Sequence, residues 1–353
     1  MKTFLFYTLL SSTVFAQNNF QKLENFLFHK PDPGMTTEAF VLWHDGKVVY
    51  DKYEKGDEET LHLLWSMSKS ISSFLLGIAQ DKGYLKISDP LIKYYKTEID
   101  KMPKDQKLHY SKLKVDHFLH MASGLDWNEF YEADPFNSHV VNMLYAKTLG
   151  DVASYVLQTP ARHAPGERFY YSSGDTNVFM DVLKKSLPKE QQSTFPWDWF
   201  FNPMGIEAIF EMDGSGTFIG SSYAYMKTKD LLKLGLLIMN KGEYEGKRIV
   251  SEDYINYAIN LSPYQKERCL EDSYMTYGAQ IWLNHKCDDG RVPFKDVPDD
   301  LVMFLGHGGQ SVFVIPSQKI IAVRIARDVH KALKKRKYTL LLMESLGIKE
   351  LEK

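Results

Sequence analysis

Ser66 and Lys69 lie three residues apart in the stretch LLWSMSKSIS, residues 63–72. On a helix, residues at this spacing share a face, so the lysine amine can reach the serine hydroxyl. A free serine hydroxyl is a poor nucleophile and needs a neighbouring base. A lysine can be that base when burial or nearby cations lower its pKa. The spacing therefore makes Ser66 a candidate nucleophile and Lys69 its candidate base.

The same spacing occurs twice more, so the pair alone is a weak signal. Ser111 and Lys114 lie in a charged stretch, and the copy at 186–189 contains a proline, a poor host for helical geometry. The helix expected at 66–82 also has a narrow face of small residues that includes Ser70, which lets a backbone or a substrate approach closely. A plain amphipathic helix is the alternative. At the start of that helix, the backbone N–H of Ser66 is a candidate oxyanion donor.

Tyr171 precedes Ser172 and Ser173 at the expected start of another helix. The structural interpretation is a turn followed by an N-cap, because serine is a preferred capping residue. The functional interpretation makes Tyr171 a phenol that moves protons beside the Ser66 and Lys69 pair.

The stretch GHGGQ places His307, Gly308 and Gly309 at the expected start of a strand. Glycine inside a strand marks a bulge or a close approach of another backbone, and a substrate on a sheet edge needs that room. The N–H of Gln310 is then the candidate second oxyanion donor. The alternative is a simple bulge with a surface histidine.

These three stretches, in this order, resemble the serine β-lactamase and penicillin-binding-protein superfamily. Further stretches, SGLDWNEFY (123–131), YSSGDTNV (171–178) and the run at 220–250, resemble the class C-like branch that holds 6-aminohexanoate-dimer hydrolase and related esterases. The resemblance implies a hydrolase that forms an acyl-enzyme on Ser66, with Lys69 and Tyr171 moving protons and no cofactor or metal.

The resemblance also implies substrate-binding residues, which are Ser173, His307, Gly309, Trp127 and Tyr131. Tyr131 resembles a mobile tyrosine that closes over substrate, although packing under a loop is an equal alternative for it and for Trp127. Ser173 replaces the usual asparagine of β-lactamases, and His307 replaces their lysine. An imidazole is mostly neutral near pH 7, so both changes argue against efficient β-lactam hydrolysis.

The expected fold class is α+β, with an antiparallel sheet built from both chain ends, flanked by helices and interrupted by a helical region. A hairpin is predicted at 39–53 around Asp45-Gly46, and another at 302–326 around residues 316–319. Helices are predicted at 66–82, 111–121, 149–158, 175–187, 228–241 and 251–261. The predicted domains are a sheet domain at 17–85 and 215–353 and a mostly helical domain at 86–214, in a β-lactamase/transpeptidase-like arrangement.

Residues 1–16 have one lysine, an apolar run too short to span a bilayer and small residues at Val14 and Ala16, which predicts a signal peptide and an exported protein without a membrane anchor. Cys269 and Cys287 are a possible disulfide in an oxidising compartment, and their state stays open. A net charge of −2 across 353 residues does not favour nucleic acid as a partner.

The function expected from the sequence is a secreted serine hydrolase that acts on a small linear amide or ester. The alternatives are a penicillin-binding, D-aminopeptidase-like or β-lactam-acylated sensor protein, and a non-catalytic binding protein that keeps the fold. His117 and His120 lack a third ligand and are expected on an ordinary helix face. The identity of the substrate and the oligomeric state do not follow from the sequence.

Overall fold

The computed structural model describes residues 20–131, 137–146, 150–265, 275–329 and 332–348. Its main element is a seven-stranded antiparallel sheet in the order β2-β1-β12-β11-β10-β9-β8. The strands are β1 Thr37–His44, β2 Lys47–Tyr53, β8 Thr276–Tyr277, β9 Trp282–Leu283, β10 Val302–Leu305, β11 Ser311–Ile315 and β12 Ile320–Ala326. Both ends of the chain therefore build one sheet, and the expected α+β, β-lactamase/transpeptidase-like arrangement is confirmed.

Turn chemistry explains the two hairpins of this sheet. Asp45 and Gly46 both have positive φ, at 44° and 95°, as the two central residues of a type I′ turn require. Between β11 and β12, the turn at Pro316–Gln318 ends at Lys319, whose φ is also positive. Both predicted hairpins are thus present with the expected turns.

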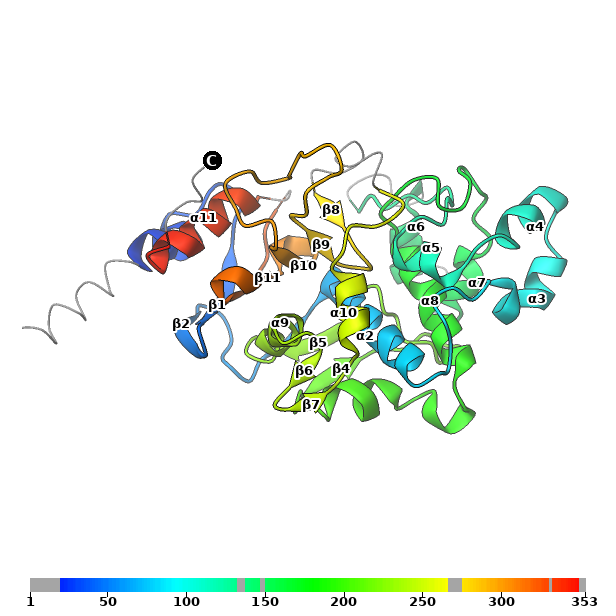
Figure 1. Cartoon of the computed structure of the whole chain (residues 1–353), viewed down its shortest axis with the longest axis horizontal. Helices are drawn as coiled ribbons and strands as arrows, with labels where there is room; N and C mark the ends of the chain where they lie inside the picture. Colours follow the sequence, from blue (N-terminus) through cyan, green and yellow to red (C-terminus); the bar gives the residue numbers. More distant parts are fainter. Residues whose placement is uncertain (1–19, 132–136, 147–149, 266–274, 330–331, 349–353) are drawn as a thin grey trace, which may run out of the picture.

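Helices cover both faces of the sheet, which is why all seven residues of β12 are buried. On one face, α11 (Lys335–Ser345) packs Tyr338 and Leu342 against strand residues such as Phe313. On the other face lie α2 (Ser68–Asp81) and α9 (Leu231–Met239). Figure 1 shows α11 at one end of the molecule and the helices α3 and α4 at the other.

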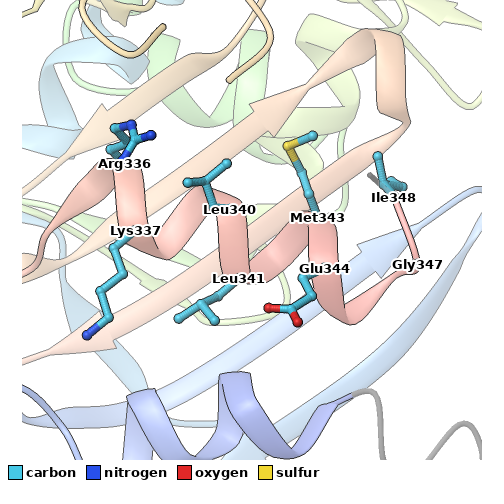
Figure 2. Close-up of a pocket in the computed structure, with 8 residues that line it drawn as sticks. All are labelled: Arg336, Lys337, Leu340, Leu341, Met343, Glu344, Gly347 and Ile348. Atoms are coloured by element: carbon cyan, nitrogen blue, oxygen red, sulfur yellow. The ribbon is translucent and has the colours of Figure 1, made fainter. Parts of the chain in front are cut away.

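A pocket runs along the outer side of α11 and is lined partly by Leu340, Leu341 and Ile348 (Figure 2). Residues of α11 pack on the sheet face opposite to α2, the helix that carries Lys69. The sheet therefore separates this pocket from the candidate catalytic residues.

The remaining helices form the region between the two parts of the sheet. They are α3 Ile92–Asp100, α4 Lys104–Tyr110, α5 Val115–Leu119, α6 His139–Val141, α7 Val152–Val156, α8 Ser173–Ser186 and α10 Glu252–Ala258, with short 3-10 or π segments at Trp65–Met67, Asn142–Ala146, Lys189–Gln191 and Trp197–Phe201. Three further short segments lie outside this region, at Asn25–His29 before β1 and at His307–Gly309 and Pro316–Gln318 between strands of the sheet. The helices α3 and α4 were not expected from the periodicity, and α5 and α7 are shorter than predicted.

Two small sheets complete the fold. The first has the order β3-β5-β4, with β3 Leu61–Leu63, β4 Ala208–Phe210 and β5 Ala224–Lys227, and the second pairs β6 Glu243–Tyr244 with β7 Lys247–Arg248. One continuous apolar core joins α2 and α8, which come from the two predicted domains. The division at residues 85/86 and 214/215 stays a prediction.

Within the described parts of the chain, no helix has the length and apolar character needed to cross a bilayer. The predicted signal peptide at residues 1–16 lies outside the described residues.

Candidate active site

Ser66 lies in a 3-10 turn, Trp65–Met67, that leads directly into α2. The residue before it, Trp65, has a φ of 49°, which is uncommon for a bulky side chain and costs backbone energy. Strain of this kind is concentrated at functional sites, where the surrounding structure holds it in place. Here Met67 is fully buried on one side of Ser66, whereas Ser66 itself keeps part of its surface exposed.

Lys69 is buried one turn further along, and its amine contacts three oxygen atoms. Its Nζ lies 3.0 Å from Ser66 Oγ, 2.8 Å from Ser173 Oγ and 3.0 Å from the carbonyl oxygen of Ser221. Burial disfavours the charged amine and lowers the pKa of Lys69 to about 8, although the negative charge of Glu129 opposes this shift. A lysine with such a pKa is partly neutral near pH 7, as a general base must be.

Tyr171 comes directly before Ser172, the N-cap of α8, whose hydroxyl accepts from the N–H of Asp175. The centroid of the Tyr171 ring lies 5.1 Å from Lys69 Nζ, and the ring stacks on Trp282 with 5.2 Å between the centroids. The Tyr171 hydroxyl interacts with Ser66. Burial, together with the charge of Glu129, raises the pKa of Tyr171 above its ordinary value. Tyr171 therefore remains a protonated phenol and can donate a proton, while Lys69 is the group that can accept one.

Ser173, in the first turn of α8, lies between Lys69 and a residue that the sequence analysis missed, Glu129. The Glu129 carboxylate accepts from the Ser173 N–H at 2.9 Å and from the Ser173 hydroxyl at 2.5 Å. Its Oε2 also accepts from Trp127 Nε1 at 2.5 Å. The only sequence signal was its position in SGLDWNEFY, two residues before Tyr131.

The sequence GHGG forms the turn between β10 and β11 rather than the start of a strand, so that expectation needs correction. Gly308 and Gly309 have φ values of 70° and 80°, which glycine adopts without strain and which break the strand. Gly306 packs so closely on Leu64 that a Cβ there would lie 2.5 Å from the Leu64 carbonyl oxygen. The turn is thereby held against the segment that carries Ser66.

The two candidate oxyanion donors lie on these two contacting segments. Within the described residues, neither the N–H of Ser66 nor that of Gln310 donates to a protein acceptor. Backbone donors that are fixed and free are what a developing oxyanion needs. Their use as an oxyanion hole stays a prediction.

The predicted substrate-binding residues fall into two groups. His307 is exposed, and its ring lies 5.0 Å from that of Tyr131 and 5.5 Å from that of Trp65, so these three rings lie beside Ser66. Trp127 is buried, its ring stacks on that of His139 at 5.2 Å, and its Nε1 donates a hydrogen bond to Glu129. The packing alternative therefore describes Trp127, whereas Tyr131 stays a candidate for substrate contact.

The small residues on α2 contact protein backbone and side chains instead of an open site. Ser70 donates to the carbonyl of Gln280, and Ser73 donates to the carbonyl of Ala279. A Cβ at Gly77 would lie 2.4 Å from the ring of Tyr254. The small residues of this face therefore allow another segment of the protein to approach closely, which was one of the two interpretations of the sequence.

His117 and His120 both hydrogen-bond to backbone groups of the protein. His117 Nδ1 accepts from the N–H of Lys114, and His120 Nδ1 lies 3.1 Å from the carbonyl of Gly278. In the part of the chain that the structure describes, no group of three or more His, Cys, Asp or Glu side chains is arranged to hold a metal ion. Cys287 is disulfide-bonded, and the only other cysteine, Cys269, lies outside the described residues.

Comparison with known proteins gives the class. The Beta-lactamase family model matches residues 23–343, which is most of the chain. The protein therefore belongs to the Beta-lactamase family, and it is a serine hydrolase with the fold of that family.

Individual relatives are more distant. The 6-aminohexanoate-dimer hydrolase of Paenarthrobacter ureafaciens is 25% identical over 233 residues, which are 63% of this chain but only 57% of that relative. A presumed 6-aminohexanoate-dimer hydrolase from Bacillus anthracis has a similar structure, with a TM-score of 0.68 at 18% identity over 88% of this chain and 78% of that one. A family VIII carboxylesterase has a TM-score of 0.66 at 12% identity over 94% and 95% of the two chains.

Proposed function

We propose that this protein is an exported serine hydrolase that cleaves a small linear amide or ester through an acyl-enzyme on Ser66. The observation that carries the proposal is the contact of 3.0 Å between the Ser66 hydroxyl and the buried amine of Lys69. The similarity to 6-aminohexanoate-dimer hydrolase supports a linear amide as the substrate class.

In the first step, neutral Lys69 takes the proton of Ser66 as its Oγ attacks the substrate carbonyl carbon. The backbone N–H groups of Ser66 and Gln310 hold the oxygen of the tetrahedral intermediate. When that intermediate collapses, the Tyr171 phenol donates a proton to the leaving nitrogen or oxygen. The Lys69 ammonium then returns its proton to Tyr171, so that both groups are restored. Water next attacks the acyl-enzyme and gives a proton to Lys69, and that proton passes to Ser66 Oγ as the acid product leaves.

Charge in the cleft bears on the choice of substrate. Glu129 places a carboxylate next to Ser173 and close enough to influence the pKa of both Lys69 and Tyr171. A substrate whose own carboxylate must lie there, as in a β-lactam, meets like-charge repulsion. At position 307 an imidazole replaces the lysine of β-lactamases, and an unperturbed imidazole is mostly neutral near pH 7. Both features favour a substrate with an uncharged or cationic acyl group over one with a carboxylate. They therefore argue against the penicillin-binding alternative.

Export is part of the same proposal. Its support is the signal-like run at residues 1–16 and the disulfide at Cys287, since disulfides persist in oxidising compartments.

The test is a substrate panel run on the wild type and on Ser66→Ala side by side. The panel holds p-nitrophenyl esters of different acyl length, linear amides with and without a terminal amine, and nitrocefin. We expect turnover of esters and linear amides that Ser66→Ala abolishes, and little turnover of nitrocefin. Stable acylation by penicillin without ester turnover would instead support the penicillin-binding alternative.

A further inference from the structure

The Ser173 hydroxyl sits between a carboxylate and an amine, and this fixes the direction of its hydrogen bonds. It donates to Glu129 Oε1 at 2.5 Å and accepts from Lys69 Nζ at 2.8 Å. An ionised carboxylate can only accept hydrogen bonds, and a hydroxyl has one proton to donate. With that proton committed to Glu129, Ser173 offers Lys69 only its lone pairs.

The third partner of the Lys69 amine has the same polarity. The Ser221 carbonyl oxygen, 3.0 Å from Nζ, can only accept. Asn177 on α8 fixes this carbonyl, because its side chain accepts from the Ser221 N–H at 3.2 Å and donates to the Ser221 hydroxyl at 3.0 Å. Two of the three positions around Nζ are therefore obligate acceptors.

A neutral lysine amine has two N–H bonds and one lone pair. If the N–H bonds point to the acceptors on Ser173 and Ser221, the lone pair is left facing the only partner that has a proton to give, Ser66. We infer that Glu129 is a positioning residue that sets this direction: by holding the proton of Ser173, it aims the lone pair of Lys69 at the Ser66 hydroxyl. The inference rests on the proposed function, because it assumes that Lys69 is the base.

The surroundings of Glu129 make the substitution Glu129→Gln a sharp test. Oε2 accepts from two fixed donors, Trp127 Nε1 and the Ser173 N–H, so an amide must place its oxygen there. Its NH2 group then faces the Ser173 hydroxyl, which has to accept. Ser173 is left to donate its proton to the lone pair of Lys69, and the base loses contact with Ser66.

The measurement is the rate at which a fluorophosphonate probe labels Ser66. In this reaction Ser66 Oγ bonds to phosphorus, fluoride leaves, and the hydroxyl proton passes to Lys69. We expect labelling of Glu129→Gln to be about 10- to 100-fold slower than wild type, within the range that general-base catalysis supplies. Asp126→Asn is the matched control, because it removes one negative charge from the same loop at an exposed site, and should label at the wild-type rate.

A double-mutant cycle with Ser173→Ala separates this effect from simple misfolding or loss of charge. Without the Ser173 hydroxyl there is no proton to redirect, so Glu129→Gln should add little further loss in the Ser173→Ala background. Wild-type labelling rates in Glu129→Gln, or an equal loss in both backgrounds, would overturn the inference while the hydrolase stands. Failure of the wild type to label overturns the proposed function itself and this inference with it.

Discussion

Arg324 and Asp328 form an ion pair, with both side chains fully buried, beneath the turn that carries Gly308 and Gly309. Arg324 Nη1 lies 2.8 Å from one oxygen of Asp328 and 3.0 Å from the Gly309 carbonyl, while the Asp328 N–H donates to the Gly308 carbonyl at 2.7 Å. Strands β12 and β1 thus anchor the turn next to Ser66, since Arg324 Nε also donates to Thr37 Oγ1.

Replacing Asp328 with asparagine should destabilise the protein strongly, because it leaves the buried Arg324 charge without its partner. The expected loss is about 3–5 kcal/mol in the free energy of unfolding, which denaturant titration measures. A loss below about 1 kcal/mol would mean that water reaches the pair, as at a surface ion pair. The exposed pair Lys96 and Asp100 is the control, and Asp100→Asn there should cost little.

Gly309→Ala should impair catalysis through the position of the Gln310 N–H. A Cβ at Gly309 would lie 2.1 Å from Asp328 Oδ2, and the φ of 80° disfavours any side chain. If the turn holds an oxyanion donor, kcat for an ester falls by roughly 10- to 1,000-fold while KM changes little. If the variant folds and its kcat is unchanged, the N–H of Gln310 is not an oxyanion donor.

The pH dependence of kcat/KM should report Lys69. Its pKa is lowered to about 8 by burial, and only the neutral amine accepts the Ser66 proton. Activity toward an ester should therefore be low in acid and rise with pH to a midpoint near 8, without a second rise from Tyr171, whose pKa is raised. Lys69→Met should lower kcat/KM by roughly 100-fold or more and abolish this profile.

Tyr171→Phe should show which proton the phenol supplies. If Tyr171 protonates the leaving group, a linear amide, whose leaving amine needs a proton, should lose roughly 100-fold or more in kcat. A p-nitrophenyl ester, which leaves readily as an anion, should lose much less. Equal losses on the two substrates would show that Tyr171 acts instead on Ser66 or on Lys69.

The raised pKa of Asp175 should make the free energy of unfolding depend on pH. It is buried beneath the N-cap of α8, and burial raises its pKa from 3.8 to about 7. Between these values the unfolded chain releases a proton that the folded chain keeps, so this group favours folding at low pH and the contribution is lost as pH rises towards 7. The free energy of unfolding of Asp175→Asn should fall less steeply over that range; an unchanged slope contradicts the assignment.

How far the sequence predicts this molecule follows from the distance between interacting residues. The Ser66 and Lys69 pair and the Asp45-Gly46 hairpin are local, and both are where the sequence analysis expected them. The superfamily resemblance predicted that Tyr171 lies in the same site, and the structure places its hydroxyl next to Ser66. Glu129 escaped notice because its meaning comes from Ser173, 44 residues away, which no spacing rule connects to it.

The turn at 307–309 shows a second limit. Its glycines indicated close approach, but only the packing of Gly306 on Leu64 shows that the partner is the segment before Ser66. The small face of α2 indicated the close approach of either a backbone or a substrate, and the hydrogen bonds of Ser70 and Ser73 to residues 280 and 279 show that it is a backbone. Small residues predict proximity, and the tertiary fold decides what comes near.

Peptide mapping of the fluorophosphonate adduct by mass spectrometry tests most directly whether Ser66 is the nucleophile. We expect a single adduct on the peptide that contains Ser66, absent from Ser66→Ala and strongly reduced in Lys69→Met. An adduct on another residue such as Ser173, or full labelling of Ser66→Ala, would contradict it.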